Sequence, residues 1–155
     1  MDRLDRKILA LYQHDTRRIA EAIGAEVGLS AAAVQRRLKR LRADGVIRAE
    51  VAQLDPVSLG ARITCIVAVS MAPSPSPHLQ LDRFKKSLAA APQVQQCYQV
   101  TGAVDFIVIV VLQSMEDYAA FARRWFEAEA GVARFDTYVA LDRVKTGVAL
   151  AFPID

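Results

Sequence analysis

The chain has 155 residues, 53% of them hydrophobic, with 20 Lys or Arg against 17 Asp or Glu. Such a composition can bury a core in one or two small domains and excludes a disordered chain. Residues 1–60 hold 11 basic and 8 acidic residues, whereas residues 61–155 hold 9 of each. The positive excess therefore lies in the first part of the chain, which favours a polyanionic partner there over a general effect on solubility.

No apolar run is long enough to cross a bilayer, since Phe106–Leu112 is far too short, and the acidic Asp2 and Asp5 do not suit a secretory signal. We therefore expect a cytoplasmic protein that has no membrane partner. Cys65 and Cys97 lie in apolar runs without metal-ligand spacing, so both are expected to be buried, reduced core residues. No metal and no cofactor are expected.

Two short helices open the chain. Leu4, Ile8 and Leu11 have helical spacing and predict the first helix, and Arg18–Val27 predicts the second, with Ile19 aligned on its apolar face. Only three residues, Gly28-Leu29-Ser30, separate this second helix from the next one. Two helices joined by a three-residue turn that contains Gly are typical of a helix-turn-helix motif.

The third helix is basic and amphipathic, with a start signal at Ser30 and a stop signal at Gly45. Val34, Leu38 and Leu41 share one face. The other faces carry Gln35, Arg36, Arg37, Lys39, Arg40 and Arg42. A basic helix alone is usually a solvated surface, but the preceding helix and turn favour a recognition helix, which packs on one side and meets DNA on the other.

The residues expected to contact double-stranded DNA lie at the start and on the polar side of this helix. They are Ser30, Ala31, Ala32, Gln35, Arg36, Arg37, Lys39 and Arg40. We expect Arg36 and Arg40 to contact phosphates, and Gln35 to read an adenine edge, because its amide can donate and accept at once.

Beyond Gly45, Val46–Leu54 predicts a short strand followed by a hinge. The expected organisation is a helix-turn-helix domain over residues 1–47, a strand and hinge over 48–60, and a second domain over 61–155. The elements expected in this second domain are strand Ile63–Met71, helix Leu79–Ala91, strands Val94–Thr101 and Phe106–Leu112, helix Met115–Ala130, and strands Arg134–Leu141 and Val144–Phe152.

The order of these elements predicts an α+β protein whose second domain is a ferredoxin-like βαββαβ sheet with two helices on one face. Ile66–Val69 and Phe106–Val111 are apolar at nearly every position, which indicates strands buried on both sides. Because two helices cover only one face, we expect a second copy of the chain to cover the other and form a homodimer.

Several stretches, taken in order, resemble the Lrp/AsnC (leucine-responsive, feast/famine) transcription factors. They are Asp2–Leu9, Val27–Ser30, Val34–Leu41, Gly45–Ile47, Thr101–Asp105, and Thr137–Val139 with Val144–Lys145. The resemblance covers the whole chain and implies an N-terminal winged helix-turn-helix domain, a C-terminal ligand-sensing ferredoxin-like (RAM) domain, homodimers that can assemble into octamers, and a free amino acid as effector. Ile19, the pair Ile23-Gly24, and the pair Ala103-Val104 depart from the family pattern.

The resemblance implies an effector site between subunits, where a loop faces a strand. Its expected residues are Val100, Thr101, Gly102, Ala103, Val104, Asp105, Thr137, Tyr138 and Val139. Gly102 permits a sharp bend, and Asp105 offers a carboxylate to an α-ammonium group. The alternative for Asp105 is an ordinary turn residue that accepts a hydrogen bond from a backbone amide.

Three classes of function fit a chain of this kind. The first is a DNA-binding regulator controlled by a small effector, expected to be an amino acid, and the second is an effector-independent architectural DNA-binding protein. The third is an enzyme, since ferredoxin-like domains also host catalysis, but the sequence has no Gly-rich phosphate loop, no nucleophile beside a base and no metal cluster. We therefore expect a regulator with no catalytic residues.

Overall fold

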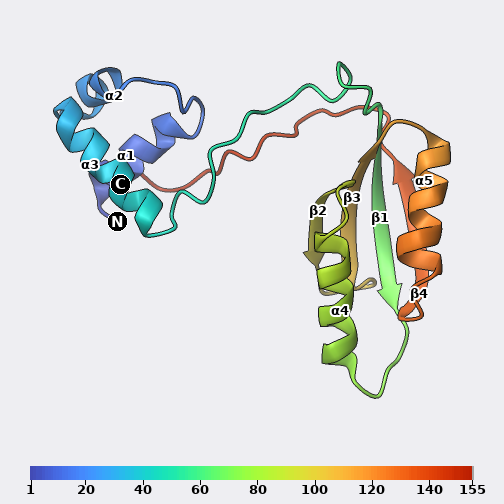
Figure 1. Cartoon of the computed structure of the whole chain (residues 1–155). Helices are drawn as coiled ribbons and strands as arrows, with labels where there is room; N and C mark the ends of the chain where they lie inside the picture. The colour runs from blue at the N-terminus through green and yellow to red at the C-terminus, as the bar shows by residue number, and fades with distance from the viewer. Residues whose placement is uncertain (155) are drawn as a thin grey trace. The chain divides into compact units, whose positions relative to one another are not determined.

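The computed structural model describes residues 1–154 and divides into two compact units (Figure 1). The helical unit contains Met1–Gln53 and the described residues from Lys145 onward, and the sheet unit contains Leu54–Val144. The end of the chain therefore belongs with the first helices, whereas the sequence had suggested that it continues the second domain. Among the described residues, no helix is both long and apolar enough to cross a membrane.

The helical unit is built on α1 (Arg3–Tyr12), α2 (Ala20–Val27) and α3 (Ala31–Ala43). Their apolar faces meet in one core made of Ile8, Tyr12, Ile23, Val27, Val34 and Leu38. The three-residue turn between α2 and α3 is as predicted, because Gly28 takes a left-handed φ of 75° and the Oγ of Ser30 accepts a hydrogen bond from the N–H of Ala33 at 3.3 Å.

The start of α2 differs from the prediction. The helix begins at Ala20 rather than Arg18, and Ile19 is an extended N-cap residue that is 64% exposed. An isoleucine side chain has no atom that accepts a hydrogen bond, so the first amides of α2 receive no side-chain cap. Ile19 therefore marks the edge of the helix and adds nothing to its apolar face.

Gly24 allows the turn before α3 to pack closely on α2. A Cβ atom at this position would lie 2.3 Å from the carbonyl oxygen of Leu29, and the N–H of Leu29 donates to the carbonyl oxygen of Gly24 at 2.9 Å. A side chain of any size would push the turn away. The position therefore requires glycine despite its low helix propensity.

Two segments that lie mostly in the helical unit and were predicted as strands are not strands. α3 ends at Ala43, Gly45 follows with a left-handed φ of 71°, and the predicted strand within Val46–Leu54 is absent from the structure. Val144–Phe152 also forms no strand; instead, the side-chain amide of Gln13 donates to the carbonyl of Leu150 at 3.0 Å and accepts from its N–H at 2.9 Å. β-branched residues favour a strand, but a strand also needs a neighbouring backbone with which to pair.

The sheet unit has the predicted βαββαβ order. Its elements are β1 (Ile63–Met71), α4 (Pro77–Ala89), β2 (Val94–Gln99), β3 (Phe106–Leu112), α5 (Met115–Ala122), the π-helical turn η1 (Arg123–Glu127) and β4 (Val132–Val139). The strands pair antiparallel in the spatial order β2-β3-β1-β4. The two central strands, β1 and β3, have the predicted bounds.

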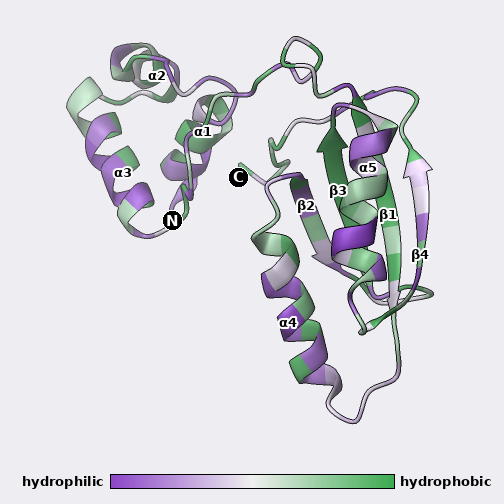
Figure 2. Ribbon diagram, turned by 45° about the vertical axis from the view of Figure 1, so that its right-hand side comes forward, coloured by the Kyte–Doolittle hydropathy of each residue, from purple (hydrophilic) through white to green (hydrophobic). Residues whose placement is uncertain are grey.

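Alternate residues of β1 and β3 face α4 and α5, and the others face away from them. The helix-covered face forms one core that includes Val67, Val69, Val108 and Val110 with Phe84, Phe121 and Phe126. The opposite face, here called the open face, carries Ile66, Ala68, Ile107, Ile109 and Val111 on the same strands. Figure 2 shows how strongly apolar β1 and β3 are compared with β4.

Two further expectations for the sheet unit were wrong. Met115–Ala130 is not a single helix, because α5 ends at Ala122 and the chain continues as the π-helical turn η1. Cys97 is exposed, whereas Cys65 is buried as expected. Cys97 lies on β2, which is an edge strand with a neighbour on one side only.

Candidate nucleic-acid interface and effector loop

One face of α3 is open to solvent and polar. Gln35, Arg36 and Lys39 are exposed and have no hydrogen-bond or ion-pair partner among the described residues. Their spacing places them on the side of the helix opposite to the buried Val34, Leu38 and Leu41. Ala32 is also exposed on this side, one turn before Arg36, and its small side chain leaves the start of the helix accessible.

Two other predicted DNA contacts on α3, Arg37 and Arg40, are bound by carboxylates of α1 and its N-cap. Arg37 Nη1 donates to Asp2 Oδ2 at 2.6 Å and to Asp5 Oδ1 at 2.8 Å, and Arg40 Nη2 donates to Asp5 Oδ2 at 2.5 Å. The sequence motifs did not reveal these contacts, because the partners are more than thirty residues apart and no local pattern links them. The one local signal was the helical repeat of α1, which places Asp5 on the same buried face as Ile8.

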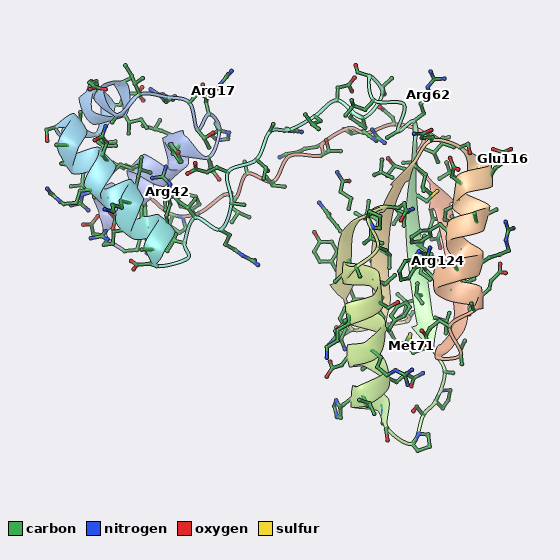
Figure 3. All side chains as sticks on the ribbon, in the orientation of Figure 1. Arg17, Arg42, Arg62, Met71, Glu116 and Arg124 are labelled. Atoms are coloured by element: carbon green, nitrogen blue, oxygen red, sulfur yellow. The ribbon has the colours of Figure 1, made fainter. Side chains whose placement is uncertain are left out.

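Arg42, whose side chain is drawn in Figure 3, is also engaged. Its Nε donates to Glu50 Oε1 at 2.8 Å, its Nη2 donates to the hydroxyl of Tyr12 at 2.8 Å, and its guanidinium lies 5.6 Å from the centre of the Tyr12 ring. These contacts tie the end of α3 to α1 and to the segment that follows. Arg42 therefore belongs to the scaffold of the unit.

The ion pairs shift the ionisation of their members. The hydrogen bond from Arg37 lowers the pKa of the Asp2 carboxyl to about 2, and the same bond raises the pKa of Arg37. Burial acts to raise the pKa of Asp5, but the hydrogen bonds from the Asp2 N–H and from Arg37 outweigh it and lower that pKa. Asp2, Asp5 and Arg37 are therefore charged at neutral pH, and their hydrogen bonds are charge-assisted.

The loop between β2 and β3 has the bend expected at Gly102, whose φ is 132°. The loop is closed by the N–H of Val100, which donates to the carbonyl of Asp105 at 2.9 Å. Asp105 Oδ2 accepts a hydrogen bond from the N–H of Met71 at 2.7 Å. One carboxylate oxygen thus has the ordinary turn role, while Oδ1 has no partner among the described residues.

The strand expected to face this loop is divided between two faces. Thr137 pairs with Val67, and its Oγ1 shares a hydrogen bond with the hydroxyl of the buried Tyr118, so it faces the helices. Tyr138 pairs with Ile66 and is 61% exposed on the open face. Thr137 and Tyr138 therefore do not line one surface, because successive side chains of a strand point to opposite sides.

Within one chain, Tyr138 and the loop also lie at different levels of β1. Tyr138 is opposite Ile66, whereas the N–H of Asp105 donates to the carbonyl of Val69 at 2.9 Å. Three residues along a strand correspond to about 10 Å. The structure of the single chain therefore does not bring the two predicted halves of the effector site together.

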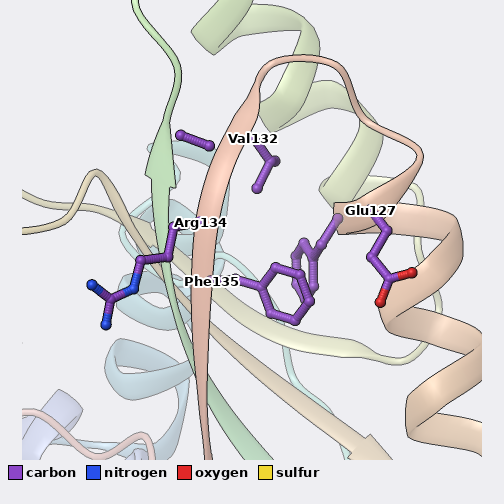
Figure 4. A pocket seen from close by; sticks show the side chains of 6 residues that line it. Glu127, Val132, Arg134 and Phe135 are labelled. Carbon is purple, nitrogen blue, oxygen red and sulfur yellow. The ribbon is translucent and has the colours of Figure 1, made fainter.

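A shallow hollow of about 560 Å³ lies between η1 and β4 and is lined by Phe126, Glu127, Val132, Ala133, Arg134 and Phe135 (Figure 4). Arg134 and Phe135 point to opposite sides of β4, and Arg134 Nη2 donates to Asp136 at 2.9 Å. The hollow thus has no set of converging polar groups. Among the described residues, no cluster of His, Cys, Asp and Glu is suited to hold a metal ion.

The family comparison also finds two domains, although its second match continues past Val144 into the segment that packs with the helical unit. The sequence model of the AsnC-type helix-turn-helix domain matches residues 1–42, and that of the Lrp/AsnC ligand binding domain matches residues 64–150. The chain belongs to the Lrp/AsnC family of transcriptional regulators. It is 41% identical to an uncharacterized HTH-type transcriptional regulator of Sinorhizobium fredii, and the alignment covers 99% of this chain and 90% of that protein.

Solved structures show the same fold. An AsnC family transcriptional regulator from Agrobacterium tumefaciens has a TM-score of 0.89 and 33% identity, covering 97% of both chains. A transcriptional regulator from Neisseria meningitidis, solved as a complex with L-Met, has a TM-score of 0.88 and 25% identity, covering 97% of this chain and 96% of that one. This Lrp/AsnC protein is therefore a DNA-binding transcriptional regulator with a ligand-binding domain, and not an enzyme.

Proposed function

We propose that this Lrp/AsnC protein binds specific DNA sites through the face of α3 that carries Gln35, Arg36 and Lys39, and that a small amino acid bound to the sheet unit changes this binding. The observation that carries the proposal is the set of unpartnered polar side chains on α3. Arg36 and Lys39 supply charge for phosphates, and Gln35 has the donor and acceptor pair that matches adenine.

The start of α3 contributes as well. Ser30 caps the helix, and the small side chains of Ala31 and Ala32 would let a phosphate approach the amides of its first turn. This contact would fix the register of the helix on DNA while the residues one turn later reach the bases.

The protein acts as a homodimer whose subunits meet through the open face of the sheet. Ile66 remains 37% exposed and Tyr98 52% exposed on this face in a single chain. Exposed apolar surface of this kind is stabilised by burial, and the same face of a second copy can pack against it in a two-fold symmetric dimer. A dimer also presents two copies of α3 to the two halves of a near-palindromic site.

The effector binds at the loop Thr101–Asp105. Thr101, Gly102 and Ala103 are exposed, and Asp105 Oδ1 remains available to accept a hydrogen bond from an ammonium group. Because Tyr138 lies too far along the sheet in the same chain, the strand 137–139 that completes this site would come from another copy. An effector held between copies would alter how they assemble, and thereby alter DNA binding.

Salt-dependent DNA binding tests the first part of the proposal. DNA fragments are selected with the wild-type protein, and affinities are measured by fluorescence anisotropy at several salt concentrations for wild type, Arg36→Ala and the control Arg83→Ala, which changes an exposed arginine on α4. Loss of one phosphate contact should lower the slope of log affinity against log salt by about 0.9. We expect this for Arg36→Ala only; equal slopes for all three proteins would reject α3 as the DNA-binding helix.

A further inference from the structure

Asp5 is the one buried charged side chain among the described residues, with no exposed surface. It lies on α1, but both of its oxygens accept hydrogen bonds from arginines of α3, at 2.8 Å from Arg37 and 2.5 Å from Arg40. Its Oδ2 also accepts from the N–H of Asp2 at 2.9 Å, which completes a capping box at the start of α1. This carboxylate therefore links the start of α1 to two arginines of α3.

The network divides the basic residues of α3 into two groups. Arg37 is 19% exposed and bound to two carboxylates, and Arg40 is half exposed and bound to one. Arg36 and Lys39 have no such partner among the described residues. The difference follows from helix geometry, because Arg37 and Arg40 lie three residues apart on the flank that packs toward α1.

We propose that Asp2 and Asp5 select which side chains of α3 reach DNA, by holding Arg37 and Arg40 away from the phosphates. This inference rests on the proposed DNA-binding function of α3. If Arg37 and Arg40 turned toward phosphates, Asp5 would remain as a buried charge without counter-ions, which is strongly unfavourable. The two carboxylates also cancel two positive charges next to the recognition surface.

The consequence is a recognition surface of limited charge. Phosphate contacts add affinity for any DNA sequence, whereas base contacts distinguish one sequence from another. With two arginines withheld, sequence-independent binding is weaker, and the side chain of Gln35 has more influence on the choice of site. Asp2 and Asp5 are thus positioning residues that act through Arg37 and Arg40.

The test compares wild type with Asp2→Asn, Asp5→Asn, Arg37→Gln and Arg36→Gln. Asn is as good an N-cap residue as Asp, so Asp2→Asn keeps the cap while it removes the charge. For each protein, affinity for a selected fragment and for random DNA is measured against salt, and the melting temperature is recorded. If Asp5→Asn does not fold, Asp2→Asn still tests whether a carboxylate restrains Arg37, because it removes one of the two that bind this arginine.

We expect Asp5→Asn, which removes the carboxylate shared by Arg37 and Arg40, to bind random DNA more tightly, with a slope steeper by up to about 0.9 for each arginine released. This corresponds to about a threefold extra loss of affinity for a fourfold increase in salt. Asp2→Asn removes one of the two carboxylates that bind Arg37, so its slope should change in the same direction but by less. The preference for the selected fragment should fall. Arg37→Gln should lower the melting temperature and leave the slope unchanged. Arg36→Gln should make the slope flatter and leave the melting temperature unchanged.

A merely structural role for the two aspartates would change the melting temperature and leave every slope as in wild type, which would overturn the inference. An Arg37→Gln slope as flat as that of Arg36→Gln would also overturn it, because Arg37 would then contact phosphate. The proposed function would survive both results, since it requires only the effect of Arg36. It fails separately if Arg36→Gln has no effect on the slope.

Discussion

The carboxylate of Asp105 accepts a 2.7 Å hydrogen bond from the backbone N–H of Met71. Met71 is the last residue of β1, so this bond fastens the loop before β3 to the neighbouring strand. The loop is therefore fixed before any ligand arrives. A fixed loop with one available carboxylate oxygen loses little conformational freedom on binding, which favours affinity for a small ligand.

Replacing Asp105 should separate its two roles. Asp105→Asn retains an oxygen for the Met71 N–H but loses the charge, and Asp105→Ala loses both. A charge-assisted hydrogen bond contributes about 1.5–3 kcal/mol, so both variants should bind the amino-acid effector about one to two decades more weakly by calorimetry. Without ligand, only Asp105→Ala should melt at a lower temperature. Wild-type affinity in Asp105→Asn would remove the carboxylate from the site.

The open face of the sheet predicts the oligomeric state. Ile107→Lys places a charge at the centre of this face, and we expect it to give monomers or insoluble protein in sedimentation experiments, because a buried lysine without a partner is strongly unfavourable. Leu79→Lys is the matched control, since Leu79 is 62% exposed on α4. It should leave the dimer intact. A wild-type chain that sediments as a monomer at micromolar concentration would contradict the proposed interface.

Gly24→Ala tests the close contact between α2 and the turn. In an exposed helix, the change from Gly to Ala stabilises by up to about 1 kcal/mol. Here the added Cβ would lie 2.3 Å from the Leu29 carbonyl oxygen, and overpacking of this kind costs about 1–3 kcal/mol. We expect a net loss of stability in chemical denaturation followed by circular dichroism. Greater stability than wild type would show that the turn moves away without cost.

The helical unit should lose stability in acid. The folded-state pKa of Asp2 is lowered from 3.8 to about 2, so its contribution is complete above pH 3.8 and is lost as the pH falls toward 2. The lowered pKa of Asp5 acts in the same direction. Asp2→Asn should therefore show a smaller loss of stability than wild type between pH 4 and pH 2, measured by denaturant titration. Parallel pH profiles would mean that this network contributes nothing to acid sensitivity.

The sequence predicts elements whose signals are local. The two central strands were predicted with the right bounds because Ile63–Met71 and Phe106–Leu112 are almost continuous apolar runs. The position of α3 was predicted correctly because Ser30 and Gly45 flank it. The prediction of a strand at Val144–Phe152 was wrong because residue composition does not indicate whether another strand lies close enough to pair with it.

The candidate sites show the same limit. The exposed Gln35 and Arg36 follow from helical periodicity, but the engagement of Arg37 by Asp5 depends on how α1 packs against α3. Likewise, Thr137 was assigned with its neighbours to the effector site, and its actual direction is set by the register of β4 on β1. Contacts between distant segments were therefore the part that sequence patterns could not supply.

The central claim is that an amino acid bound to the sheet unit controls DNA binding by α3. The most direct measurement is the affinity of the full-length protein for its selected DNA fragment, with and without each of the common amino acids at saturating concentration, in wild type and in Asp105→Asn. Allosteric coupling is typically about 5- to 150-fold. We predict that at least one amino acid changes the wild-type affinity by about fivefold or more and has no such effect on Asp105→Asn. If none of them changes DNA affinity or the oligomeric state, the account is contradicted, and an architectural DNA-binding protein without an effector becomes the better description.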